Sequence, residues 1–114
     1  MKSTEINYDF YLSIAYNDTC VQILEDLINL LKTYPNVNLT SYNESTLKGR
    51  RKAFMLKGGY SAKLSPFVVI YDIDKNPLKA FYSEVEECTV ENIKFYLDMF
   101  IIQQKQNTYE STNS

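Results

Sequence analysis

A proline precedes the most strand-like stretch of this chain. Ser65-Pro66 is followed by Phe67 to Ile73, a run that is mostly apolar or aromatic. Because proline lacks an N–H, it would remove a ladder hydrogen bond from a central strand, so Pro66 is expected at the strand's first position. Apolar residues on both faces indicate a central strand covered on both sides. The Ser65-Pro66 peptide bond has two interpretations: an ordinary trans entry to the strand, or a cis bond in a tight turn.

The first part of the chain predicts a strand, a helix and a second strand. Residues 8–16 alternate between faces with the period of a strand. Asn17-Asp18-Thr19 offers three helix-capping residues, and the apolar spacing is helical over residues 19–33 until Pro35 stops it. Residues 37–42 alternate again. This order predicts two parallel strands joined by a right-handed crossover.

A polar, basic helix is predicted at residues 46–57, between the capping segment Glu44-Ser45-Thr46 and the helix-ending Gly58-Gly59. We expect its few apolar residues to anchor it: Leu47, Ala53, Phe54, Met55 and Leu56. Half of the 12 basic residues of the chain lie between Glu44 and Asp72 with no acid among them: Lys48, Arg50, Arg51, Lys52, Lys57 and Lys63.

The later part of the chain predicts a hairpin and a final helix. The strands at residues 67–73 and 78–83 flank turn residues Asp74 to Pro77, so we expect them to pair antiparallel. Thr89 can cap a helix over residues 90–102 that carries one apolar face.

Length and composition predict one domain, residues 1–102, followed by a polar tail at 103–114 that is expected to be unstructured. No stretch has the roughly 18 apolar residues of a membrane span, and the first residues do not resemble a secretory signal. Histidine is absent from the sequence, which excludes Ser–His and Cys–His catalytic pairs and imidazole metal sites. Two cysteines do not make a disulfide-dense scaffold, so a reducing setting is expected.

The predicted order β-α-β-α-β-β-α resembles the thioredoxin superfamily over residues 8–102. The resemblance depends on the aromatic strand end Ala15-Tyr16, on Cys20 in the first turn of the following helix, on Ser65-Pro66, and on the hairpin turn from Asp72 to Pro77. It implies an α/β fold, with a four-stranded mixed sheet flanked by three helices. It also implies a cis proline before the third strand, in a loop that faces the start of the first helix.

The superfamily's redox motif is Cys-x-x-Cys at that helix start, where the helix N-terminus lowers the pKa of the attacking thiol. If Tyr16 corresponds to the motif's leading aromatic residue, Asn17 stands where the attacking cysteine belongs and Cys20 stands at the resolving position. The resemblance then implies a substrate or partner loop without a dithiol, made of Tyr16, Asn17, Asp18, Thr19, Ser65 and Pro66.

Cys20 has three interpretations: a buried structural residue, a monothiol or glutathione-linked catalytic residue, and a partner in a regulatory disulfide. Asp18 beside it disfavours a thiolate, because a neighbouring negative charge raises the pKa of a thiol. Cys88 lies among Glu86, Glu87 and Glu91 and is interpreted as structural. We expect no Cys20–Cys88 bridge, since the two helix starts are expected at different places around the sheet.

The basic segment 48–63 is either a solvated helix face or an anion site. In glutaredoxin-like relatives a basic residue near the second helix and the backbone before the proline hold glutathione. The resemblance implies Lys48, Arg51, Leu64 and Ser65 for these roles. Nucleic-acid binding is less favoured, because Tyr60 is the only nearby aromatic residue that is not expected in the core.

These observations leave two hypotheses. The first is a thioredoxin-fold module that binds a protein partner without a cofactor, a metal or dithiol catalysis. The second is a glutaredoxin-like or monothiol thiol–disulfide oxidoreductase that uses Cys20 and glutathione. The expected location is the cytoplasm. The alternative is a virion-associated protein, since Gly58 to Phe67 also resembles small thioredoxin-like proteins of bacteriophages.

Overall fold

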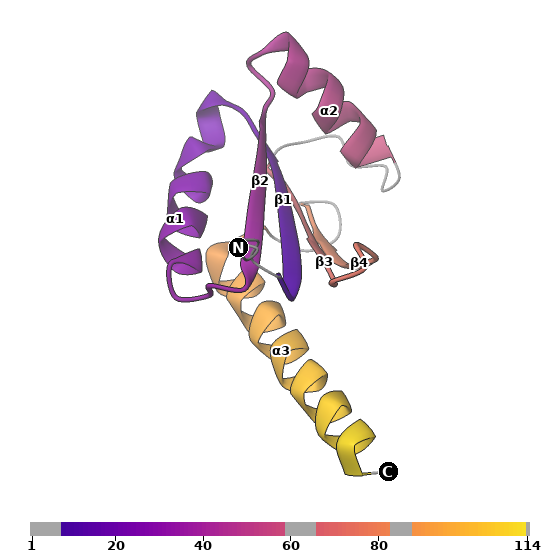
Figure 1. The fold of residues 1–114 in the computed structure, drawn as a ribbon. Helices are drawn as coiled ribbons and strands as arrows, with labels where there is room; N and C mark the ends of the chain where they lie inside the picture. The colour runs from indigo at the N-terminus through magenta and orange to yellow at the C-terminus, as the bar shows by residue number, and fades with distance from the viewer. Residues whose placement is uncertain (1–7, 59–65, 83–87, 114) are drawn as a thin grey trace, which may run out of the picture.

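A computed structural model describes residues 8–58, 66–82 and 88–113, with side chains as far as Lys105 (Figure 1). The elements follow the predicted order β-α-β-α-β-β-α, with a short 3-10 turn, η1 (Asp18–Cys20), before the first helix. They are β1 (Phe10–Tyr16), α1 (Val21–Leu31), β2 (Val37–Asn43), α2 (Leu47–Gly58), β3 (Phe67–Tyr71), β4 (Pro77–Phe81) and α3 (Val90–Asn113).

The sheet has four strands in the order β2-β1-β3-β4. β1 and β2 are parallel, which confirms the predicted βαβ unit, and β3 and β4 are antiparallel, which confirms the predicted hairpin. β3 also pairs antiparallel with β1, so the apolar strand is central as predicted. α1 and α3 cover one face of the sheet and α2 covers the other (Figure 1).

Predicted capping residues begin three of the four helical segments, namely η1, α2 and α3. Asn17 caps η1 through its side chain, which accepts a hydrogen bond from the Thr19 N–H. The Thr46 hydroxyl accepts one from the Gly49 N–H at the start of α2, and the Thr89 hydroxyl accepts one from Asn92 at the start of α3. These side chains satisfy N–H groups that have no partner within the helix, which is why the helices begin there.

Strand alternation divides the apolar side chains between the two faces. Phe10, Leu12 and Ile14 of β1 point toward α1 and α3 and pack with Leu27 and Leu97. The opposite face is smaller. Its fully buried residues are Ala15, Ala53, Phe67 and Val69.

α2 lies unusually close to the sheet at Gly49. A Cβ at this position would overlap the backbone carbonyl of Asn43, so only glycine fits there without a shift of the backbone. Ala53 continues the same buried stripe one turn later. The expectation that Leu47, Phe54 and Met55 anchor α2 is therefore wrong: the buried stripe holds small residues, and these three large side chains are exposed.

α3 continues to Asn113, where the sequence predicts an unstructured tail from Gln103 onward. The polar residues after 102 contain neither glycine nor proline. A helix already nucleated by packing against the sheet can continue through such a segment, because adding one residue to an existing helix costs far less than starting one.

Candidate functional site

The pairing of the strands brings the predicted loop residues to one end of the sheet. Ala15, near the end of β1, pairs with Phe67 at the start of β3, so the next positions outward are Tyr16 and Pro66. η1 follows directly after Tyr16. The structure therefore confirms that Pro66 stands at the entrance of its strand and beside the start of the first helical segment. Ser65 and Leu64 lie outside the described residues, so the cis peptide bond remains a prediction.

Asn17 is the centre of the hydrogen bonds at this end. Its side-chain oxygen accepts bonds from the Thr19 N–H at 3.0 Å and from the Thr19 hydroxyl at 2.5 Å. The Cys20 thiol donates to the same oxygen at 3.4 Å, and the Asn17 N–H donates to Cys20 Sγ at 3.3 Å. Asn17 thus caps η1 and holds the Cys20 thiol at the same time.

The Cys20 thiol is neither buried in the core nor freely exposed. The residue is half-buried, and it is the N-cap of α1 rather than part of its first turn. Cys20 is therefore less buried than a core residue, and its three interpretations stay predictions. Asp18 and Thr19 are exposed beside it, whereas Tyr16 is half-buried and packs on the core beneath α1 and α3.

Cys88 reaches the same end of the sheet, and this corrects a prediction. Cys88 packs against the core cluster that also includes Tyr16 and Leu24, and it lies near enough to Cys20 for the two side chains to interact electrostatically. Burial raises the pKa of the Cys88 thiol to about 12, and the negative charge of the nearby Cys20 thiolate contributes to this rise. The expectation that the two helix starts lie apart is wrong. Both cysteines are nevertheless free, as expected.

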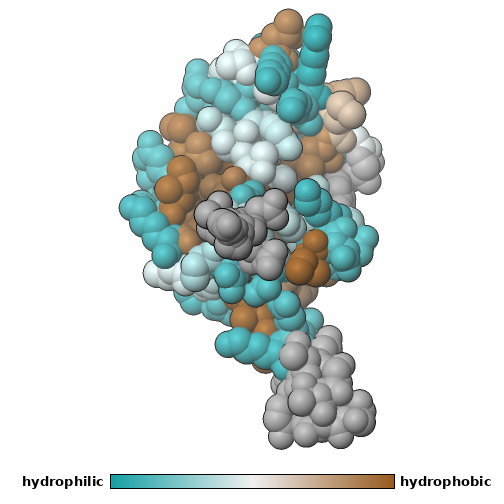
Figure 2. Space-filling view, in the orientation of Figure 1, coloured by the Kyte–Doolittle hydropathy of each residue, from teal (hydrophilic) through white to brown (hydrophobic). Residues whose placement is uncertain are grey.

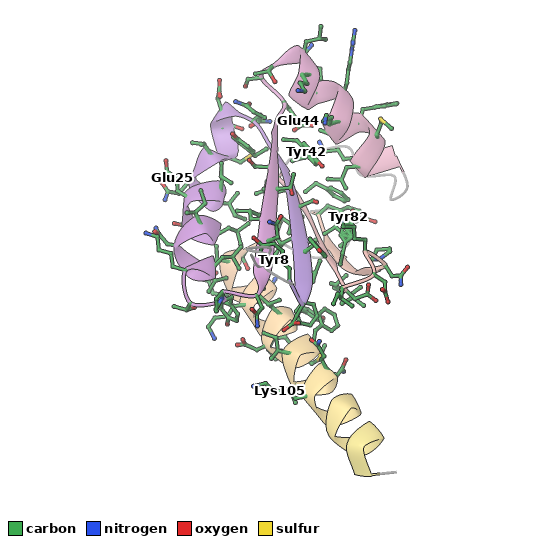
Figure 3. The ribbon with its side chains drawn as sticks, viewed as in Figure 1. Tyr8, Glu25, Tyr42, Glu44, Tyr82 and Lys105 are labelled. Atoms are coloured by element: carbon green, nitrogen blue, oxygen red, sulfur yellow. The ribbon has the colours of Figure 1, made fainter. Side chains whose placement is uncertain are left out.

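The predicted anion-binding residues lie on a different part of the molecule. Lys48 and Arg51 are exposed on α2, across the sheet from α1 and Cys20. Lys57 has a partner: its Nζ lies 2.7 Å from the Glu44 carboxylate, with side chains only 11% and 17% exposed. Glu44 and the aromatic Tyr42 and Tyr82 lie on the side of the sheet that α2 covers (Figure 3). Lys57 therefore belongs to a largely buried ion pair and not to the exposed basic surface of α2.

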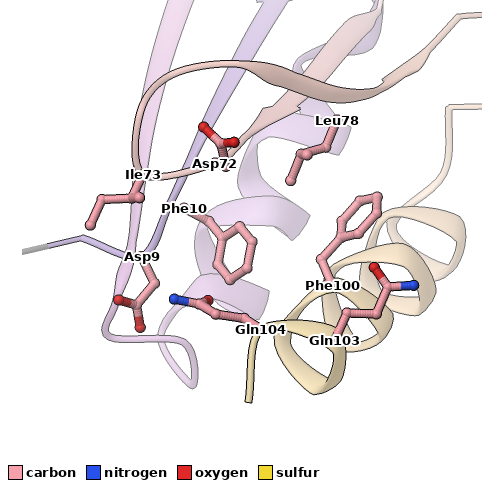
Figure 4. Close-up of a pocket in the computed structure, with 8 residues that line it drawn as sticks. All are labelled: Asp9, Phe10, Asp72, Ile73, Leu78, Phe100, Gln103 and Gln104. Atoms are coloured by element: carbon pink, nitrogen blue, oxygen red, sulfur yellow. The ribbon is translucent and has the colours of Figure 1, made fainter. Parts of the chain in front are cut away.

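A cavity at the opposite end of the sheet was not predicted from the sequence. Its volume is about 290 Å³, and it lies between the β3–β4 turn and the middle of α3 (Figure 4). Apolar side chains such as Phe10 and Phe100 line it, and Asp9 and Asp72 contribute carboxylates. Asp72 is already occupied, since its Oδ1 accepts bonds from the Asp74 and Asn76 N–H groups of the turn. Sequence periodicity carries no signal for this cavity, because it forms between segments distant in the chain.

Comparison with solved structures identifies the fold. Thioredoxin f2 of Chlamydomonas reinhardtii superposes with a TM-score of 0.60 at 15% identity, covering 84% of this chain and 83% of that one. Thioredoxin-2 of the malaria parasite, a component of its protein secretion machinery, gives 0.60 at 11% identity, covering 85% and 88%. This chain has a thioredoxin-like fold.

The sequence comparisons add nothing to this assignment. No family model and no curated protein sequence matches the chain. The thioredoxin-like fold is therefore established by its architecture, while the bacteriophage origin stays a prediction. Among residues 8–58, 66–82 and 88–105, no three potential ligand side chains gather in the way that a metal ion would require. None of the described helices has both the length and the apolar character needed to cross a membrane.

Proposed function

We propose that the protein is a thioredoxin-fold module that binds a protein partner at the sheet end formed by Tyr16, η1 and Pro66, without dithiol catalysis. The observation that carries the proposal is the role of Asn17. Its side chain caps η1 and holds the Cys20 thiol, so the position of the attacking cysteine is taken by a residue that cannot form a disulfide. In this proposal the loop presents a partner segment, and position 17 supplies no nucleophile.

The state of Cys88 supports the same proposal. A thiol must ionise to attack a disulfide, and a pKa of about 12 keeps Cys88 protonated near neutral pH. Cys88 cannot then replace the missing attacking thiol. Two free cysteines also suit the reducing cytoplasm that the sequence predicts, whether of a cell or of an infected cell that assembles virions.

A second candidate is supported by one contact at Cys20. The Asn17 N–H donates a hydrogen bond to Cys20 Sγ, which holds the half-buried thiol at the start of α1 and outside the core. Cys20 would then act as a single thiol that attacks the disulfide of a glutathionylated substrate. The Cys20–glutathione disulfide forms as the substrate leaves as a thiol, and a second glutathione regenerates Cys20 by leaving as glutathione disulfide. Lys48 and Arg51, which the resemblance implies for the carboxylates of glutathione, lie across the sheet from Cys20, and this counts against the second candidate.

Restoring the missing thiol separates these candidates. We expect wild type to be inactive in reduction of insulin disulfides, and Asn17→Cys to gain turnover that is lost again when Cys20→Ser is added. Asn17→Ser is the matched control, because serine also caps a helix but brings no thiol. Robust activity of the wild type with glutathione, abolished by Cys20→Ser, would establish the second candidate and reject the first.

Partner binding is tested with a displayed library of random peptides selected on the immobilised full chain. The proposal expects selected peptides to bind wild type and to lose about tenfold in affinity to Tyr16→Ala. Thr19, which is exposed beside Tyr16, offers a milder second variant, Thr19→Ala. If no selected peptide depends on either residue, the sheet end is not the binding site.

A further inference from the structure

The outward face of α2 presents large apolar side chains that the fold does not use. Leu47 is 59% exposed, Phe54 77% and Met55 79%. They lie seven and eight residues apart along a helix, so they share one side of it. Figure 2 shows the result, with apolar atoms scattered among hydrophilic ones over α2 at the top of the molecule.

Basic side chains surround these apolar groups. Arg51 falls on the same helical side, one turn after Leu47 and about one turn before Phe54 and Met55. Lys48 and Lys52 flank the group on one edge, and all three basic residues are exposed. α2 contains no acidic residue, and Glu44 nearby is bound to Lys57. We call Leu47, Lys48, Arg51, Phe54 and Met55 the α2 face. It combines an apolar centre with a positive field.

The close approach of α2 to the sheet explains why these side chains face outward. Gly49, Ala53 and Lys57 form the buried stripe, and at Gly49 the helix lies too near the sheet for even a methyl group. Leu47, Phe54 and Met55 fall on the other side of the helix. The large residues therefore contribute little to folding while exposing apolar surface to water. Three large apolar side chains exposed on one side of a single helix favour a binding surface over isolated surface residues.

The types of residue indicate what covers the patch. Phe, Met and Arg are enriched at the centres of protein–protein interfaces. A nucleic-acid surface would need several stacking aromatics, and the α2 face has one, Phe54. A membrane-binding helix keeps its charges away from its apolar side, whereas Arg51 lies within it.

We propose that the α2 face docks an acidic amphipathic helix of a partner protein. The proposal rests on the proposed role as a protein-binding module and gives that module a second surface, across the sheet from Tyr16. α2 has 12 residues and so spans about 18 Å, which matches roughly three turns of a partner helix. Leu47, Arg51 and Phe54 form a ridge that a partner's groove can receive, with partner carboxylates facing Arg51 and Lys48.

The probe is a displayed library of peptides of about 14 residues, long enough for roughly four helical turns, selected on the full chain. The expected products are acidic peptides with apolar residues three and four positions apart. Synthetic copies should bind wild type more weakly as salt rises from about 50 to 500 mM. They should lose about tenfold or more in affinity to Arg51→Glu and to Phe54→Ala.

Matched controls lie on α3. Phe95 is 64% exposed on α3, across the sheet from the α2 face, and Lys105 is exposed on the part of α3 remote from α2 (Figure 3). Phe95→Ala and Lys105→Glu should leave affinity unchanged. A charge swap tests whether Arg51 contacts the peptide directly. Peptides with Lys in place of Glu should regain affinity for Arg51→Glu, which they would not do if the substitution only disturbed the helix.

Several results would overturn the docking proposal. These are a selection without acidic peptides, binding that survives both Arg51→Glu and Phe54→Ala, or failure of the charge swap. Binding of oligodeoxythymidine or phosphatidylserine vesicles through the α2 face, without peptide binding there, would assign the face to another partner class. Failure of the proposed function is read separately, from Cys20-dependent reductase activity and from the effect of Tyr16→Ala.

Discussion

On the face covered by α1 and α3, large side chains such as Leu27 and Leu97 fill the space between helices and sheet. On the other face α2 meets the sheet through Gly49 and Ala53, and its own large residues point to solvent. Both arrangements hold a helix on a sheet. The first gains its free energy from buried apolar area, and the second has little such area, so it depends on close fit and on the Lys57–Glu44 ion pair. α2, which buries less apolar area than α1 and α3, is also the helix whose large side chains are exposed and free to contact a partner.

The largest expected effect comes from truncating a side chain on the face of the sheet that α1 and α3 cover. Leu97 is fully buried, so Leu97→Ala should lower the free energy of unfolding by about 2–5 kcal/mol. Phe54→Ala on α2 should change the free energy of unfolding by less than about 0.5 kcal/mol, because the Phe54 ring is mostly in water. Urea unfolding measures both. Equal losses would mean that Phe54 is packed and that the contrast between faces is false.

The next effect tests the close approach of α2. Alanine favours a helix more than glycine, by about 1 kcal/mol, so propensity alone predicts that Gly49→Ala stabilises the protein. We expect the opposite, a loss of about 1–3 kcal/mol, because the new methyl group would overlap the Asn43 carbonyl.

Gly58→Ala is the control, since nothing lies within 4 Å of the position its Cβ would take. This variant should unfold at the same or slightly higher urea concentration than wild type. If Gly49→Ala behaves like Gly58→Ala, α2 does not approach the sheet as closely as described.

The smallest effect concerns a group of polar interactions between the end of α1 and α3. The Tyr34 hydroxyl donates to the Asp98 carboxylate at 2.5 Å, and this bond joins the end of α1 to α3. Lys94 Nζ lies 2.8 Å from the same carboxylate. The hydrogen bonds from Lys94 and Tyr34 lower the pKa of Asp98 below its usual value of 3.8. The stabilisation is therefore complete above the usual pKa and is lost as pH falls through the lowered one.

Asp98→Asn should reduce stability at pH 7 by less than about 1 kcal/mol, because the side chain is 41% exposed and water screens its charge. The difference from wild type should shrink in acid, below the usual pKa of the carboxyl. Urea midpoints across this range measure it. A difference that stays constant with pH would mean that the asparagine acts through packing and not through charge.

The sequence predicted the elements well because local signals carry them. Asn17, Thr46 and Thr89 cap the segments they were expected to cap, and the alternation in β1 assigns Phe10, Leu12 and Ile14 to one face. The candidate site was predicted as far as Tyr16, Asn17 and Pro66, because strand order alone places them at one end of the sheet. The predictions failed where the packing of helices on the sheet decides the outcome. Phe54 and Met55 were expected to be buried and are exposed, and Cys88 was expected far from Cys20 and lies near it.

The sequence by itself determined the order of strands and helices, their caps and the absence of a cysteine at Asn17, because periodicity, capping chemistry and residue identity are local properties. Only the tertiary structure decided which apolar residues are buried. Phe54 and Ala53 are adjacent and both apolar, yet Ala53 is buried and Phe54 is exposed. The reason is the contact at Gly49, which brings the start of the helix so near the sheet that small side chains fill the space there, while Leu56 and Lys57 pack near the helix end.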